Sequence, residues 1–413
     1  MKKLITSLVF ILFLVSTSLL IAQDLKSFKE ITGKIIDADT KKPLVFTDIV
    51  IKNSNISTIT NSDGEFLLKL PNTFLEGSIT ISHLGYKKRE LKISSIKNQE
   101  EIGLTPSITQ LNEISITATI KNARELVEET IKKKSSLYNN KSTLMTAFYR
   151  ETIKKRRKNA SLSEAVVKIH KQPYNNKRRD HIELIKARKS TDYSKLDTLA
   201  LKLQGGPFSN LYTDIIKYPE YIFNDEDLPK YKFSYGNSTS INNRQIYVVN
   251  FKQKEGLSIP LYYGKLYIDA ETLALTNAVY SLNVSNRELA SRMYVRKKPR
   301  KVDVYPTEAT YRVNYRTTND QWHYAYSNIS LTFKVNWKGK LFNNTYTLNS
   351  EMAITDLEIQ DTNLAKIRGK LIRPTTILSE KASGFSLLKN TDGLYFTPEE
   401  YKEKIAALQV DKD

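Results

Sequence analysis

The stretch from Ile31 to Ala118 constrains the fold of this chain more than any other part of its sequence. Short runs of alternating apolar and polar residues recur in it at roughly 8–12-residue spacing, separated by Asp, Gly, Asn and Pro. Asp63-Gly64 has apolar residues on both sides, which is a strong hairpin signal because glycine accepts the positive φ of a tight turn. This pattern is typical of a small antiparallel β-sandwich, which we place at residues 24–119.

The same stretch also resembles a known family. The residues that carry the resemblance are Gly33, Asp37, Pro43-Leu44, Thr60, Asp63-Gly64, Phe66 and Leu84-Gly85-Tyr86. In this combination they resemble the carboxypeptidase-regulatory-like domain, a transthyretin-like sandwich. Leu111 to Ala118 resembles the segment that closes this domain ahead of TonB-dependent outer-membrane receptors. The family more often has Thr-Asp before the turn, where this chain has Asn61-Ser62-Asp63-Gly64. The resemblance is to the accessory sandwich and implies no peptidase domain.

The N-terminus has the pattern of a secretory signal peptide. Met1-Lys2-Lys3 is a basic head, Leu4 to Ile21 is an almost unbroken apolar run, and Ala22-Gln23 precedes polar residues. We therefore expect residues 1–23 to be removed on export. The alternative is an uncleaved membrane anchor, because the apolar run is just long enough to span a bilayer.

The chain contains no cysteine. An exported protein without cysteine has no disulfides and no lipid on an N-terminal cysteine, so ordinary hydrophobic cores must hold its domains. Export without cysteine fits the periplasm of a Gram-negative bacterium better than an animal extracellular space. We therefore expect a protein of the periplasm or of the periplasmic face of the outer membrane.

Basic residues outnumber acidic ones, 64 Lys and Arg against 44 Asp and Glu, for a formal net charge of +20. Such a surplus attracts polyanions. In a periplasm these would be lipid phosphates and the lipopolysaccharide face of the outer membrane, while the export signal argues against nucleic acid. Simple solubility explains the charge equally well.

A region of different character begins at about residue 120. Apolar residues from Ala123 to Ile131 recur at three- and four-residue steps, which predicts an amphipathic helix. Strands then dominate to about residue 358, and their succession without long helices implies an antiparallel sheet. A short helix or lid is expected near Pro207 to Ile222, and residues 361–413 are expected to form a tail with a terminal helix after Thr397-Pro398.

Two parts of this region resemble other proteins. The helix followed by Phe148-Tyr149-Arg150-Glu151 resembles a stretch that follows the sandwich in periplasmic proteins of unassigned function. Tyr263 to Ala274 is similar to the central hairpin of outer-membrane lipoprotein-sorting proteins, which hold acyl chains on the concave face of a half-open, strongly curved sheet. The resemblance implies a mainly β chain: a transthyretin-like sandwich, then a helix and a larger curved antiparallel sheet over residues 120–360.

The sequence shows no motif for catalysis or metal binding. The histidines are His83, His170, His181 and His323. None belongs to a motif that pairs a metal with an activating carboxylate, although a hairpin would bring His170 and His181 together. Gly205-Gly206-Pro207 is too short to cradle a phosphate, and Asp225-Glu226-Asp227 is expected to be a solvated turn. We therefore predict no enzyme, no cofactor and no catalytic or metal-binding residues.

Three basic clusters lie at apparent strand ends: Lys154 to Lys158, Lys177 to Arg179, and Arg296 to Lys301. Gathered on one rim, they would form an edge that binds phosphate groups. The alternative is that each is an independent solvated turn.

Three rows of residues, most of them aromatic, alternate with polar residues, so that the members of each row are expected to share one face of a strand. They are Trp322, Tyr324 and Tyr326; Tyr311, Val313 and Tyr315; and Phe333, Val335 and Trp337. Core packing is the common explanation. The alternative is an open apolar or glycan-binding concavity.

These observations favour a non-enzymatic binding or assembly accessory of the periplasm or outer membrane. Its expected partner is an envelope protein or another outer-membrane component. The alternative is a carrier of lipid or lipoprotein acyl chains on the curved sheet.

Overall fold

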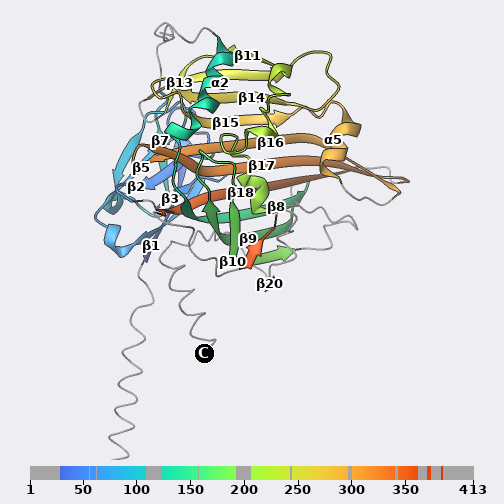
Figure 1. Cartoon of the computed structure of the whole chain (residues 1–413). Helices are drawn as coiled ribbons and strands as arrows, with labels where there is room; N and C mark the ends of the chain where they lie inside the picture. The colour runs from blue at the N-terminus through green and yellow to red at the C-terminus, as the bar shows by residue number, and fades with distance from the viewer. Residues whose placement is uncertain are drawn as a thin grey trace, which may run out of the picture.

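The computed structural model describes residues 28–54, 56–61, 63–107, 122–156, 158–191, 206–241, 244–295, 300–339, 343–360, 370–373 and 383–384. These residues form an N-terminal β-sandwich and a large curved antiparallel sheet, as the fold-class prediction requires (Figure 1). The signal peptide, the segment Leu111 to Ala118, the first residues of the Arg296 cluster and the terminal helix lie outside the described residues.

The sandwich consists of two sheets around an isoleucine- and leucine-rich core. One sheet has the order β4-β1-β7, with β1 (Phe28–Asp37), β4 (Glu65–Pro71) and β7 (Glu100–Leu104). The other has the order β3-β2-β5-β6, with β2 (Asp48–Ile51), β3 (Ser57–Ile59), β5 (Ser78–Ser82) and β6 (Arg89–Lys92). The 3-10 helices η1 (Asn72–Phe74) and η2 (Ile93–Ser95) connect strands within it.

The turn at Asp63-Gly64 is tight, and Gly64 has the expected positive φ of 75°. It does not join two paired strands, however, because β3 pairs with β2 and β4 pairs with β1. The hairpin prediction was therefore wrong in its pairing. The turn carries the chain from one sheet of the sandwich to the other, and the Gly64 carbonyl accepts a hydrogen bond from the Ile35 amide of β1 at 2.8 Å.

The predicted amphipathic helix is α2 (Ala123–Lys132). Asn122 caps it, because its side chain accepts a hydrogen bond from the Glu125 amide at 2.9 Å. Leu126 and Val127 are buried, while the charged residues face outwards. The short helix α3 (Lys134–Leu137) follows.

The large sheet has thirteen strands among the described residues, in the order β11-β13-β14-β15-β16-β17-β18-β8-β9-β10-β19, with β12 beside β13 and β20 beside β10. The first run is β8 (Thr143–Lys155), β9 (Lys158–Lys171) and β10 (His181–Thr191). The second run is β11 (Tyr231–Tyr235), β12 (Thr239–Ile241), β13 (Arg244–Gln253), β14 (Tyr262–Asp269), β15 (Leu275–Leu282), β16 (Val302–Thr318), β17 (Gln321–Trp337) and β18 (Asn344–Ile359). The short strands β19 (Lys370–Ile372) and β20 (Ser383–Gly384) extend the β10 edge.

Helices and one long connection cover what we call the inner face of this sheet. α2 packs on β11, and α4 (Pro207–Leu211) packs on β17 and β18. Residues 212–230, with η3 (Pro219–Tyr221) and η4 (Leu228–Lys230), continue from α4 to β11. At the other end of the long strands, α5 (Arg287–Tyr294) packs on β16 (Figure 1). None of the helices among the described residues is both long and apolar enough to cross a membrane.

The sandwich packs against the opposite, outer face. Ile59 of β3 forms a small apolar cluster with Tyr326 of β17 and Ala353 of β18. The Ser57 hydroxyl donates to the Ile354 carbonyl at 3.3 Å, and the Gly85 amide donates to the Ser240 carbonyl at 2.8 Å. The sandwich and the large sheet are therefore in direct contact along β3 and β12.

Candidate ligand site at the domain junction

Two of the three aromatic rows form the inner core as the core-packing interpretation expects. Val313 and Tyr315 are buried there with Tyr311 packed beside them, and Phe333 and Val335 are buried at the α5 end with Trp337 packed beside them. The inner face, where acyl chains would lie in a carrier, is thus occupied in these places by the chain's own side chains.

The third row does not share one face. Trp322 and Tyr324 are buried in the inner core, whereas Tyr326 contacts Phe46 of the sandwich on the outer face. The reason is a β-bulge: Asn314 pairs with Tyr326 and Tyr315 pairs with Tyr324, so that Ala325 is an extra residue in β17. A single extra residue reverses the faces of all that follow, which strict alternation cannot anticipate.

His83, His170 and His323 make local hydrogen-bond contacts. His170 and His181 are opposite each other in the β9–β10 ladder, as the sequence suggested. His170 Nε2 lies 3.2 Å from Glu183 Oε2, while His181 is exposed. His83 Nδ1 lies 3.1 Å from the Thr47 hydroxyl. Within the described ranges, no group of three or more metal-binding side chains is close enough to hold an ion.

The acidic run Asp225-Glu226-Asp227 lies in the turn before η4. Asp225 and Glu226 are exposed, and Asp227 pairs with Lys230 at 2.6 Å. Its position is that of a solvated turn.

The large sheet also contains a buried polar cluster that the sequence did not reveal. Lys171 Nζ lies 2.8 Å from Asp180 Oδ2 and 2.7 Å from Asp214 Oδ2. Burial alone would lower the pKa of Lys171, but the two carboxylates outweigh burial and raise it. Tyr174 and Tyr315 donate hydrogen bonds to the Asp214 carboxylate at 2.8 and 2.9 Å. Because the members of this cluster satisfy one another, it serves to fix the segment after α4 onto the inner face.

Two of the predicted basic clusters lie at the same end of the sheet. The Arg156 amide donates to the Thr345 carbonyl at 2.8 Å, and the Lys338 amide donates to the Lys301 carbonyl at 2.9 Å. The β8–β9 turn, the start of β18, the end of β17 and the start of β16 are therefore neighbours. We call their cations the basic rim: Lys154, Lys155, Arg156, Lys158, Arg300, Lys301 and Lys338.

The third cluster, Lys177 to Arg179, lies in the β9–β10 turn at the opposite end of β9. The rim crosses five adjacent strands, β16 to β9, and four strand spacings make it about 19 Å wide. Lys154 to Lys158 and the described part of the second cluster, Arg300 and Lys301, thus lie on one edge, whereas Lys177 to Arg179 lies at the other end.

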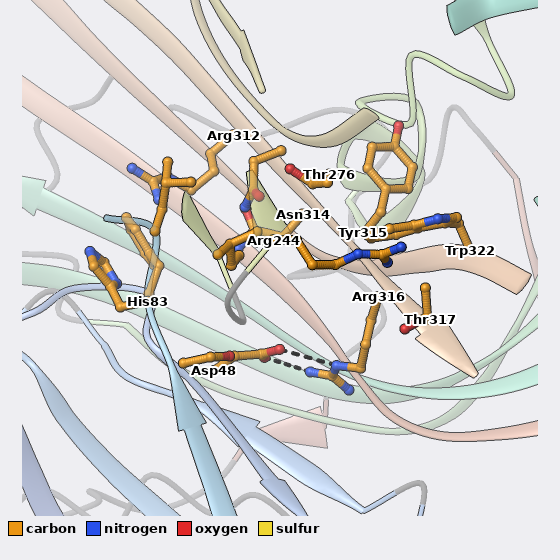
Figure 2. Close-up of a pocket in the computed structure, with 15 residues that line it drawn as sticks. Asp48, His83, Arg244, Thr276, Arg312, Asn314, Tyr315, Arg316, Thr317 and Trp322 are labelled. Carbon is orange, nitrogen blue, oxygen red and sulfur yellow. Dashed lines mark hydrogen bonds and ion pairs between the residues drawn. The ribbon is translucent and has the colours of Figure 1, made fainter. Parts of the chain in front are cut away.

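A cavity of about 130 Å³ lies between the sandwich and the outer face of the large sheet (Figure 2). The sandwich lines it with Phe46, Asp48 and the segment Ser82 to Leu84. The sheet contributes Arg244 from β13, Asn277 from β15, and Arg312, Asn314 and Arg316 from β16. Three arginines thus face a cavity whose lining contains a single carboxylate, that of Asp48.

Two of these arginines have carboxylate partners. Arg316 Nε and Nη2 donate to the two oxygens of Asp48 at 3.1 and 2.5 Å, as the dashed lines in Figure 2 mark, and its Nη1 donates to the Ser57 hydroxyl at 2.8 Å. Arg244 Nε lies 3.0 Å from Asp269 Oδ2, and its guanidinium lies 5.9 Å from the centre of the Trp322 ring.

The third arginine is different. The Arg312 guanidinium lies 4.7 Å from the centre of the Phe46 ring, and no carboxylate within the described residues pairs with it. Burial lowers the pKa of Arg312. Burial, followed by the charge of Arg312, also lowers the pKa of His83 to about 4, so this histidine is neutral at pH 7. The cavity is therefore electropositive and partly shielded from water.

Residues 31–116 match the family model described as CarboxypepD_reg-like domain, which confirms the resemblance of the sandwich. No protein of curated function matches the chain in sequence. Among solved structures, a DUF1329 family protein from Desulfovibrio piger is similar at 9% sequence identity, over 59% of this chain and 96% of that chain. Its TM-score of 0.23 is too low to indicate a shared fold.

Sequence reasoning missed the junction cavity, although a signal for it existed. Arg312, Asn314 and Arg316 alternate with Tyr311, Val313 and Tyr315 along one strand. The two arginines and the asparagine share one face of this strand, but Asp48, the partner of Arg316, lies 268 positions away in the sequence.

Proposed function

We propose that this protein is an exported, non-enzymatic accessory of the bacterial envelope that binds the anionic face of a membrane through its basic rim. The observation that carries the proposal is the convergence of two separate basic clusters at one end of the large sheet. Phosphate groups of anionic lipids attract such clusters, each nearby Lys or Arg contributing about 1 kcal/mol. The carboxypeptidase-regulatory-like sandwich is fixed to the outer face, so it would move with the sheet as one unit.

The rim is well suited to a charged surface rather than to a buried ligand. Lys154, Arg156, Lys158, Arg300 and Lys338 are exposed. At this end of the sheet β17, β18 and β8 are paired on both sides, which fixes the backbone positions from which the cations extend. On such an array several phosphates can be contacted at once without ordering a flexible tail.

Co-sedimentation with lipid vesicles tests this function. The mature protein should pellet with vesicles rich in phosphatidylglycerol, remain in solution with phosphatidylcholine vesicles, and detach as salt is raised. The triple variant K154E/R156E/K158E should lose binding by at least about tenfold.

The matched control is K177E/R178E/R179E, which reverses three exposed charges at the opposite end of the sheet. It changes the net charge equally and should keep most of the binding. If the two triple variants lose binding to the same extent, only net charge matters and the rim has no special role.

A further inference from the structure

The junction cavity offers a binding site that is separate from the basic rim. Its lining has three guanidinium groups, of which Arg316 is neutralised by Asp48, and Arg244 by Asp269. The charge of Arg312 is left without an acidic counterpart among the described residues. A cation that is partly removed from water and unpaired is unfavourable unless a mobile anion supplies the missing charge.

Two amide oxygens beside Arg312 also lack hydrogen-bond partners. Asn277 of β15 and Asn314 of β16 are directly opposite each other in the sheet. Both line the cavity, and the Oδ1 atom of each is buried without a hydrogen-bond partner. Asn277 is only 6% exposed. Since buried polar atoms are nearly always paired, these two mark a place where a further group belongs.

An amide can turn by 180° and offer its NH₂ group instead of its oxygen, and the two orientations are nearly indistinguishable in shape. Arg312, Asn277 and Asn314 can therefore present several N–H donors to one anion. The guanidinium is a planar fork that matches the two oxygens of a carboxylate.

The size and charge of the cavity restrict the ligand. A volume of about 130 Å³ suits a small molecule. The volume favours such a small molecule over an acyl chain or a sugar chain. One uncompensated positive charge calls for a ligand with one negative charge, which a carboxylate carries and a phosphate at pH 7 exceeds.

We propose that the junction cavity binds a small free carboxylate, held by the guanidinium of Arg312 and the side-chain amides of Asn277 and Asn314. Because Phe46 and His83 of the sandwich form the opposite wall, a bound carboxylate would bridge the two parts of the chain and strengthen their contact. This inference does not depend on membrane binding by the rim.

Thermal unfolding of the full mature chain tests the inference. Sodium acetate should raise the midpoint by about 2 °C or more above the effect of sodium chloride at equal ionic strength. Arg312→Gln should abolish this difference, while Arg178→Gln, which removes an exposed arginine outside both the cavity and the rim, should keep it. Inorganic phosphate should stabilise less than acetate.

A second variant keeps the test decisive if Arg312→Gln fails to fold. Asn277→Asp places a carboxylate of nearly the same shape beside Arg312. It should raise the midpoint without acetate and remove the response to acetate. Saturation-transfer NMR with acetate should show contact with the wild type and not with Asn277→Asp.

An acetate effect equal to that of chloride would overturn the proposal, and so would an undiminished response in Asn277→Asp. Stabilisation by phosphate without any by acetate would contradict the assignment to a carboxylate.

Discussion

Asp48 of the sandwich and Arg316 of the large sheet form a bidentate ion pair, in which Arg316 Nε and Nη2 donate to the two carboxylate oxygens. Both side chains are mostly shielded from solvent, at 26% and 18% exposure. A bidentate pair of this kind fixes the relative orientation of the two side chains as well as their distance. This contact is the main polar link that joins the two parts of the chain in a defined geometry.

Loss of this link should separate the unfolding of the two parts. Arg316→Met leaves Asp48 without its partner and should weaken the contact by about 2 kcal/mol. Calorimetry should then show two transitions, or a clear low-temperature shoulder. Hydrogen exchange of the β3 amides should accelerate, because β3 is buried from both sides only while the sandwich is attached.

The control for this prediction is Lys52→Met, which removes the exposed pair with Glu90 elsewhere on the sandwich. Exposed pairs contribute little, so its unfolding should match that of the wild type. Identical unfolding of Arg316→Met and wild type would show that the ion pair does not hold the parts together.

The buried cluster around Asp214 should matter for stability. Asp214→Asn keeps the shape but leaves Lys171 with one carboxylate, and breaking a buried ion pair in this way costs about 3–5 kcal/mol. Urea unfolding should show the loss, whereas Asp225→Asn in the exposed turn should stay within about 0.5 kcal/mol of the wild type. An equally small effect for Asp214→Asn would refute the structural role of the cluster.

Stability should fall as the pH rises towards neutrality because of Glu151. Burial raises the pKa of this carboxyl to about 7 from an ordinary value of 4.5, and the hydrogen bond from Tyr149 only partly offsets burial. A raised pKa means that the folded protein prefers the protonated form. The contribution of the protonated Glu151 carboxyl to the free energy of unfolding is fully present below pH 4.5 and is lost as the pH rises through about 7.

Glu151→Gln cannot ionise and should avoid this loss. Relative to the wild type it should gain about 3 kcal/mol of unfolding free energy between pH 4.5 and pH 8. Urea unfolding of both proteins at pH 5 and pH 8 measures the difference. If the unfolding free energies of the two proteins change in parallel with pH, the Glu151 carboxyl does not have a raised pKa.

The sandwich could be predicted from the sequence because its signals are local. Alternating runs and turn residues within about 90 positions define its strands, and the same holds for α2. The inner core was also anticipated, since Tyr311, Val313 and Tyr315 alternate regularly. The bulge at Ala325 was not anticipated, because no sequence pattern shows where one extra residue lies within a strand of seventeen residues.

The polar sites were out of reach for a different reason. Lys171 binds Asp180 and Asp214, which lie 9 and 43 residues further along the sequence. Arg316 binds Asp48, which is 268 residues away in the sequence. Only the tertiary fold brings such partners together. The basic rim was foreseeable as clusters of charge, but the placement of the Lys177 cluster at the opposite end depends on strand direction and length.

Fractionation of cells that express the full chain tests the central claim most directly. We predict that the processed protein is found in the envelope fraction, is released by high salt, and becomes soluble in the periplasmic fraction when the rim carries K154E/R156E/K158E. The K177E/R178E/R179E protein should stay with the envelope. An unprocessed protein in the cytoplasm, or an envelope association that neither salt nor the rim variant disturbs, would contradict the account.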